Sequence, residues 1–129
     1  MILRSFIVAV LAWLVPGLGH LALGRYAKAG YFATLILGMF ALGVAVGEGA
    51  SVSSSRFPAH VYGQYCAYLP AWISEHFWGS AHQAMTVARL ELGVVFTTVA
   101  GILNVVVVVD AYETSRGEKQ TESTAEKVA

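Results

Sequence analysis

The hydrophobic pattern of the chain is dominated by an unbroken apolar run over residues 92–109. Its 18 residues carry no charge, and twelve of them are Leu, Ile, Phe or Val. A helix rises about 1.5 Å per residue, so the run spans about 27 Å, close to the ~30 Å hydrocarbon core of a bilayer. Val105–Val109 alone is also typical of a buried strand, but no neighbouring strands with turn signals accompany it. We therefore predict a transmembrane helix over 92–109.

A second, lighter apolar run covers residues 30–47. It holds eight Leu, Ile, Phe or Val residues, worth about −2 to −5 kcal/mol on membrane-insertion scales. A helix of this strength inserts only marginally by itself, so we expect it to rely on packing against its neighbours.

The first apolar segment, residues 5–24, is interrupted at Pro16-Gly17. Proline removes a helical hydrogen bond, and irregular backbone within a bilayer survives only when it is buried in protein or faces water. We expect a broken helix whose Pro-Gly turn packs against the other segments. A cleaved signal peptide is the alternative, but Ala27-Lys28-Ala29, the best cleavage site, lies too far beyond the apolar core.

Composition agrees with a small polytopic membrane protein. The chain has 129 residues, of which 57% are hydrophobic and only 12% are charged, whereas about 25% are charged in an ordinary soluble domain. The predicted fold is all-α, with one membrane domain over 1–113 and a polar, flexible tail over 114–129. A net charge of zero gives no electrostatic case for nucleic acid, and the single Cys66 allows no intrachain disulfide.

The distribution of basic residues predicts the orientation. Arg25 and Lys28 lie in the short first connection, and the tail carries three more cations, whereas the long connection 48–91 carries only Arg56 and Arg89. The positive-inside rule places the Arg25/Lys28 turn and the tail in the cytoplasm and connection 48–91 outside. Arg4 is ambiguous: a full first span puts it outside, and a re-entrant segment keeps it inside. The predicted location is the bacterial inner membrane.

Two stretches carry a resemblance to known sequences. Val15-Pro16-Gly17-Leu18-Gly19-His20, the following Leu23-Gly24-Arg25 and Ala27-Lys28-Ala29-Gly30 resemble the TM-two (two-transmembrane-helix) domain family. Ala100–Asn104 and Val109-Asp110-Ala111-Tyr112 are similar to the last helix of a group of uncharacterised small bacterial membrane proteins. The resemblance implies architecture and a set of motif residues, with no established chemistry: Pro16, Gly17, Gly19, His20, Gly24, Arg25, Lys28 and Asp110.

Small residues recur every four positions in two of the predicted helices, which is typical of close helix–helix packing. The expected packing residues are Gly30, Thr34, Gly38, Gly43 and Gly47 in the second run and Gly93, Thr97, Gly101 and Asn104 in the third. We expect these faces to meet each other or a partner chain. Asp110 either pairs with Arg25 or Lys28 or marks the water boundary, and the sequence favours the boundary.

The long connection is rich in aromatic residues, namely Phe57, Tyr62, Tyr65, Tyr68, Trp72, Phe77 and Trp78. Because Trp and Tyr favour the headgroup region, we expect short interfacial helices here. A quinone or other ligand site is the alternative. His20 lies near membrane depth, but haem ligation needs a second axial ligand, and His60, His76 and His82 belong to the connection. We expect no cofactor and no metal.

No catalytic motif is present: the serines near Ser51 lack the GxSxG elbow, and no carboxylates pair at membrane depth. The sequence therefore predicts a non-enzymatic membrane protein that acts by helix packing. Its partners would be the lipid bilayer and other membrane subunits, or its own copies. A redox or ligand-binding module that uses His20 and the aromatic connection is the alternative.

Overall fold

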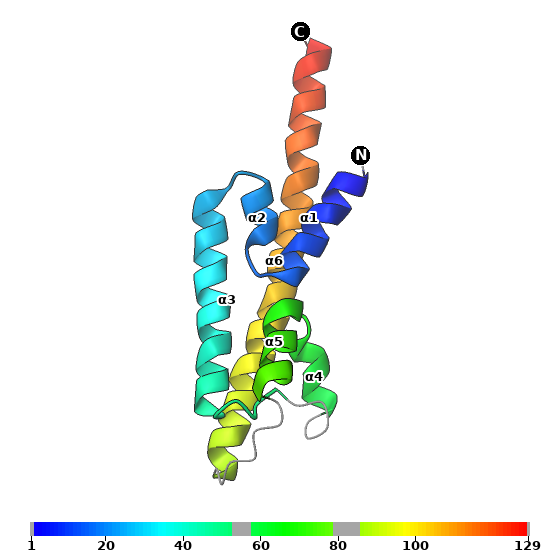
Figure 1. Cartoon of the computed structure of the whole chain (residues 1–129). Coiled ribbons are helices and arrows are strands. Elements are labelled where there is room, and N and C mark those ends of the chain that lie inside the picture. Colours follow the sequence, from blue (N-terminus) through cyan, green and yellow to red (C-terminus); the bar gives the residue numbers. More distant parts are fainter. Residues whose placement is uncertain (1, 53–57, 79–85, 129) are drawn as a thin grey trace.

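A computed structural model of the chain describes residues 2–52, 58–78 and 86–128. Within these ranges the chain is all-α, as predicted, and has no strand, so Val105–Val109 is helical. The helices, shown in Figure 1, are α1 (Ile2–Leu14), α2 (Leu18–Ala22), α3 (Tyr26–Val46), α4 (Pro58–Gln64), α5 (Tyr68–Trp78) and α6 (Val87–Val128).

Two helices, α3 and α6, form the frame of the molecule. Both are long and apolar enough to cross a membrane, judged by length and composition. They run antiparallel side by side (Figure 1). In their most apolar windows only 22% of the residues in α3 and 39% of those in α6 are buried. Most of each helix therefore presents apolar side chains to the surroundings, unlike the core helix of a water-soluble protein.

Both helices extend beyond the predicted segments. The run predicted over 30–47 begins at Tyr26, and the run predicted over 92–109 is the middle of α6. The polar tail 114–129, expected to be flexible, continues α6 as helix to Val128. Its glutamate, lysine and glutamine residues are good helix formers, so a helix already nucleated by the apolar run can propagate through them.

The first segment does not cross the molecule. Helix α1 has 13 residues, about 20 Å of helix, and it ends just before Pro16, as predicted. Gly17 then adopts φ 90°, and α2 returns toward the end at which α1 began. Ser5 bonds Ser115, and the chain N-terminus lies at the same end of the bundle as the Arg25 turn (Figure 1). Ser5, next to Arg4, therefore lies at the end of the molecule where the tail begins. We call α1 and α2 the N-terminal hairpin.

The connection 48–91 also folds inward. Helices α4 and α5 are here called the aromatic hairpin. Helix α4 packs along α6, where a Cβ on Gly101 would overlap the carbonyl oxygen of Gly63, and α5 contacts α1 and α3. Since Gly101 lies in the middle of the apolar run, α4 lies beside that run. The buried residues of the two helices, such as Gln64 and Ala71, pack against the bundle. Their expected position at the membrane interface stays a prediction. Residues 53–57 and 79–85, including Phe57 and His82, lie outside the described residues.

The two hairpins meet beside Asn104. Its side-chain amide donates to the carbonyl oxygen of Ala12 at 3.1 Å and to that of Cys66 at 2.9 Å. The Trp13 indole N–H donates to the carbonyl oxygen of Tyr65 at 3.1 Å, and its ring lies 5.0 Å from that of Tyr68. These bonds supply donors to carbonyl groups that helix ends leave without partners.

Two apolar clusters fill the spaces between the elements. The larger joins α3, α5 and α6 around Ile36, Phe40, Ala71, Ala100 and Val107. The smaller joins α1 to α6 through Val8, Ala12 and Ala111. The core is therefore a seam along one side of α6, with the hairpins closing it from opposite ends.

We predict that Asn104→Leu destabilises the fold by about 1–3 kcal/mol, because the buried carbonyl groups of Ala12 and Cys66 lose their donor. Thermal unfolding in mild detergent measures the effect. Val106→Leu, at an exposed position of the same helix, is the matched control and should unfold at the wild-type temperature. Equal unfolding temperatures for both variants would contradict the assigned role of the amide.

Candidate functional site

The motif residues lie along the N-terminal hairpin, in the turn that leads from it into α3, and on the facing part of α6. Pro16 and Gly17 form its turn, Gly19 and His20 lie on α2, and Gly24 and Arg25 connect α2 to α3. Lys28 lies in the first turns of α3, and Asp110 is supplied by α6 from the other end of the sequence. Asp110 thus joins His20 and Lys28, which lie 90 and 82 positions before it in the sequence.

His20 is completely buried, with 0% of its surface exposed. Its Nε2 lies 3.1 Å from Oδ2 of Asp110, and its ring stacks on Phe32 with centroids 5.3 Å apart. The carboxylate is within ion-pairing distance, but not in a hydrogen-bonding direction, and neither ring nitrogen has a hydrogen-bond partner among the described residues. A buried imidazole in this position is held mainly by packing and by the nearby negative charge.

Asp110 also pairs with Lys28, whose Nζ lies 3.2 Å from the same Oδ2 atom. The sequence favoured a plain boundary role for Asp110 and left this pairing as the alternative, and the structure has the pairing. Since 45% of the Lys28 side chain and 39% of the Asp110 side chain are exposed, the pair contributes at most about 1 kcal/mol. The main effect of the pair is on the arrangement of the helices, because the Asp110 carboxylate on α6 contacts both His20 on α2 and Lys28 on α3.

The backbone that presents His20 depends on two glycines. A Cβ on Gly19 would lie 2.7 Å from the Ala12 Cβ and 3.0 Å from that of Ala111, so α2 can lie this close to α1 and α6 only without a side chain there. Gly24 has φ 72°, which lets the Arg25 N–H reach the carbonyl oxygen of His20 at 2.9 Å. This left-handed residue ends α2 and starts the turn into α3.

A family model matches residues 7–123, a stretch that contains most of the N-terminal hairpin, the aromatic hairpin and the whole cluster. The chain belongs to DUF6677, a family of unknown function. No curated protein and no solved structure matches the chain. The match agrees with the resemblance to uncharacterised proteins but gives no support to the one to the TM-two domain family.

In this DUF6677 member the predicted packing residues fall into separate groups. Gly43 and Gly47 meet Gly93 and Thr97, since a Cβ on Gly93 would lie 2.6 Å from the Gly43 carbonyl oxygen. Gly101 instead meets the aromatic hairpin, and Asn104 points inward to both hairpins. The remaining small residues lie on the outer face of α3. A Cβ added at Gly30 or Gly38 would meet nothing within 4 Å, and Thr34 is exposed.

Several buried polar residues were missed by the sequence reasoning. Gln64, fully buried, donates to the Ser51 carbonyl oxygen at 2.9 Å and to the Thr97 hydroxyl at 2.7 Å. Ser5 and Ser115 bond at 2.6 Å near the other end. The spacing of Thr97, Asn104 and Ser115 is seven and eleven residues, which puts all three on one face of a helix. This spacing could have predicted that the three polar side chains share one face of the helix. No sequence pattern indicated which residues of other elements they would contact.

The chemistry open to the cluster is limited by its enclosure. The described residues hold no group of three or more His, Cys, Asp or Glu side chains placed to bind a metal. The imidazole of His20 lies between the Phe32 ring and Asp110, so an axial ligand could reach Nε2 only by displacing the carboxylate. The geometry fits a role in fixing the hairpin against α3 and α6.

We predict that Asp110→Asn lowers the unfolding free energy by about 1–2 kcal/mol, because both His20 and Lys28 lose their charged neighbour. Lys28→Met removes only the half-exposed pair and should cost less than about 1 kcal/mol. Detergent unfolding curves of the two variants and of the double variant measure the difference. Equal, small losses for both single variants would show that the contact with His20 contributes nothing.

Proposed function

We propose that this chain is a non-enzymatic, polytopic protein of the bacterial inner membrane that acts by helix packing. In this role it is an accessory or assembly subunit of a larger membrane complex, or it assembles with its own copies.

The apolar outer surface supports the membrane location. Large apolar side chains are exposed along all the long elements, while polar side chains such as Asn104 and Gln64 are buried in the seam. In water this arrangement would leave a continuous apolar surface far larger than monomeric soluble proteins tolerate. In a bilayer it is the stable one, because lipid solvates the outer face and the backbone polar groups are satisfied inside.

The exposed small-residue face of α3 carries the docking proposal. Gly30, Thr34 and Gly38 lie four residues apart on this face. A Cβ added at either glycine would meet nothing within 4 Å, and Thr34 is exposed. A hollow of about 460 Å³ lies over Gly30, Tyr31, Thr34 and Leu35. Faces of this kind let a second helix approach closely, which is what drives association where lipid gives no hydrophobic effect between helices.

The charge distribution supports the orientation. The N-terminal hairpin returns to its starting side, so Arg4 joins Arg25, Lys28 and the basic residues of the tail at one end of the bundle. A cluster of cations on one side is what the positive-inside rule assigns to the cytoplasm.

A redox or ligand-binding role remains the second candidate, and the buried His20 is the observation in its favour. The enclosure of its ring by Phe32 and Asp110 favours the packing role instead. An absorption spectrum of the purified protein separates the two: a Soret band that disappears in His20→Phe would overturn the packing proposal.

We predict that Leu3 and Gly117 lie on the same side of the membrane and Ala59 on the other. The test uses Cys66→Ala as the background and introduces Leu3→Cys, Gly117→Cys or Ala59→Cys for labelling by an impermeant maleimide in oriented vesicles. Labelling of Leu3→Cys from the side opposite to Gly117→Cys would contradict the re-entrant hairpin.

We predict that Thr34→Leu and Gly38→Leu release the protein from its native complex, lowering the recovered partner at least about tenfold. A leucine on this face holds the facing helix away and removes the close contact. Mild-detergent extraction, native-gel separation and mass spectrometry measure the ratio of partner to protein.

Val106→Phe is the matched control, since it adds a bulky apolar group to an exposed position of α6. It should leave the complex intact. A wild-type protein that migrates as a single isolated chain, or partner loss in all three variants alike, would overturn docking through α3.

A further inference from the structure

Helix α2 is a short element between two glycine turns. It has five residues, and Gly17 before it and Gly24 after it have φ angles of 90° and 72°. Glycine passes between such left-handed angles and ordinary ones at little steric cost, so both turns can change conformation. Helix α1 is held in place independently of α2, because the Asn104 amide donates to the Ala12 carbonyl oxygen. Helix α2 can therefore move while α1 stays where it is.

Helix α2 buries two of its residues, Gly19 and His20. A Cβ on Gly19 would lie 3.0 Å from that of Ala111, so the α2 backbone lies directly over this alanine of α6. The His20 ring stacks on Phe32 and is fully buried, yet neither ring nitrogen has a hydrogen-bond partner in the part of the chain that the structure describes. A neutral imidazole fits this enclosure far better than an imidazolium, because burying a charge costs much more than burying a neutral polar group.

The charged groups around His20 do not balance a proton on its ring. Asp110 on α6 lies 3.1 Å from Nε2, but the same carboxylate oxygen already pairs with Lys28 on α3 at 3.2 Å. Burial lowers the pKa of His20, and the Asp110 carboxylate opposes this shift only in part. The charges of Lys28 and Arg25 lower the pKa further, and the one charged residue of α1, Arg4, is also a cation.

The position of α2 therefore depends on pH. When α2 is displaced, His20 is in contact with water and titrates near its ordinary pKa of about 6.5, whereas in the packed position its pKa is lower. The packed position is thus fully stable above about pH 6.5 and loses stability as the pH falls below that value, because the displaced form binds the proton more tightly.

We propose that α2 is a proton-controlled flap, which covers Ala111 and Phe32 while His20 is neutral and opens when the ring takes up a proton. This would make the candidate site a sensor of acidification, and the inference holds whether or not the outer face of α3 docks a partner.

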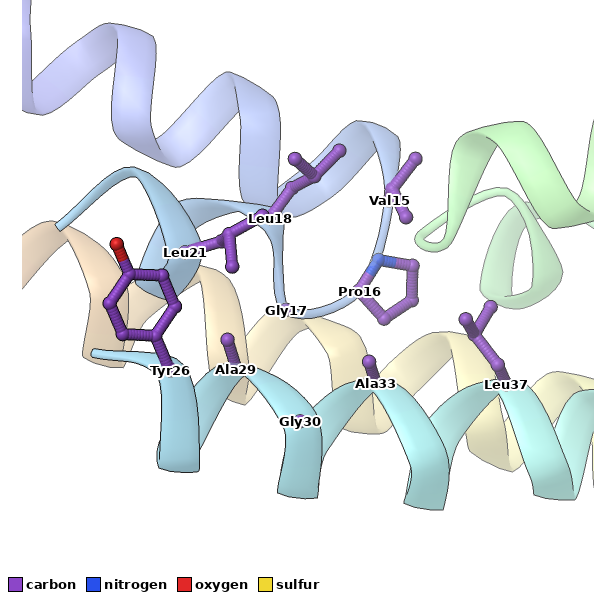
Figure 2. Close-up of a pocket in the computed structure, with 10 residues that line it drawn as sticks. All are labelled: Val15, Pro16, Gly17, Leu18, Leu21, Tyr26, Ala29, Gly30, Ala33 and Leu37. Atoms are coloured by element: carbon purple, nitrogen blue, oxygen red, sulfur yellow. The ribbon is translucent and has the colours of Figure 1, made fainter. Parts of the chain in front are cut away.

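Opening of the flap would also widen the groove between the N-terminal hairpin and α3. This groove has a volume of about 330 Å³, and Figure 2 shows Gly17 and Leu21 on its hairpin side and Ala29 and Ala33 on its α3 side. Leu21 belongs to α2, so movement of the flap would uncover Ala29, which is buried in the packed position. Ala29 on α3 and Ala111 on α6 are therefore two separate reporters of opening.

The test measures how fast a buried cysteine reacts in the full chain, purified in mild detergent. In a Cys66→Ala background, Ala111→Cys lies under the flap, and Val109→Cys, two residues away and exposed, is the matched reference. Reaction with a dipyridyl disulfide is followed at about pH 7.5 and about pH 5, and the reference corrects for the reactivity of a thiol at each pH. The ratio of the Ala111→Cys rate to the Val109→Cys rate should rise at least about fivefold at the lower pH.

Replacement of His20 by an uncharged side chain should remove this pH dependence. In His20→Gln the ratio of the two rates should be equal at both pH values, and circular dichroism checks that each variant folds. Where His20→Gln does not fold, His20→Phe, which keeps a ring stacked on Phe32, takes its place. Where Ala111→Cys does not fold, Ala29→Cys is the buried probe.

An equal ratio at the two pH values in the chain that carries His20 would overturn the proposal. A rise of the same size in His20→Gln would overturn it as well, because the proton would then act at another group such as Asp110. Neither result bears on docking through α3, which is measured by partner recovery in Thr34→Leu and Gly38→Leu.

Discussion

The amide of Asn104 satisfies backbone carbonyl groups of two helices that stop halfway along α6. Helix α1 ends near Ala12 and the α4–α5 turn lies at Cys66, and both present carbonyl oxygens to the same side chain. Without these bonds the two helix ends would be buried without partners in the middle of an apolar bundle, at a cost of about 1–3 kcal/mol for each group. The half-length hairpins, the seam they close and the enclosure of His20 all depend on this point.

The interior of the molecule combines apolar clusters with several buried polar side chains, and large apolar side chains are exposed on its exterior. Four polar residues of α6 each contact another element, namely Ser115, Asp110, Asn104 and Thr97. Between them Val107 joins the core, while Val99, Val105, Val106 and Val109 are exposed. Hydrogen bonds and ion pairs thus define the positions of the two hairpins along α6, since apolar contacts alone would permit the hairpins to slide along it. The sparsely packed region lies at the outer face of α3, where the docking face is found.

The local features of the fold were predictable because they depend on short stretches of sequence. The break at Pro16-Gly17 was found from the missing proline N–H, and the two long helices from the length of their apolar runs. The full lengths of those helices were not predicted, since propagation through 110–128 depends on a helix already formed. The inward folding of the aromatic connection was missed because aromatic residues suit both an interface and a packed core, and only their partners decide between them.

The sequence by itself determined an all-α chain with two long apolar helices and a broken first segment, because hydrophobic length and proline chemistry act locally. It also supplied His20, Lys28 and Asp110 as motif residues. Only the tertiary structure decided that Asp110 lies between the other two, that the first segment returns to its starting side, and that Gly30 and Gly38 face outward while Gly43 and Gly93 meet. These outcomes depend on which faces of distant elements come into contact, and helical periodicity fixes the faces of each helix but not their partners.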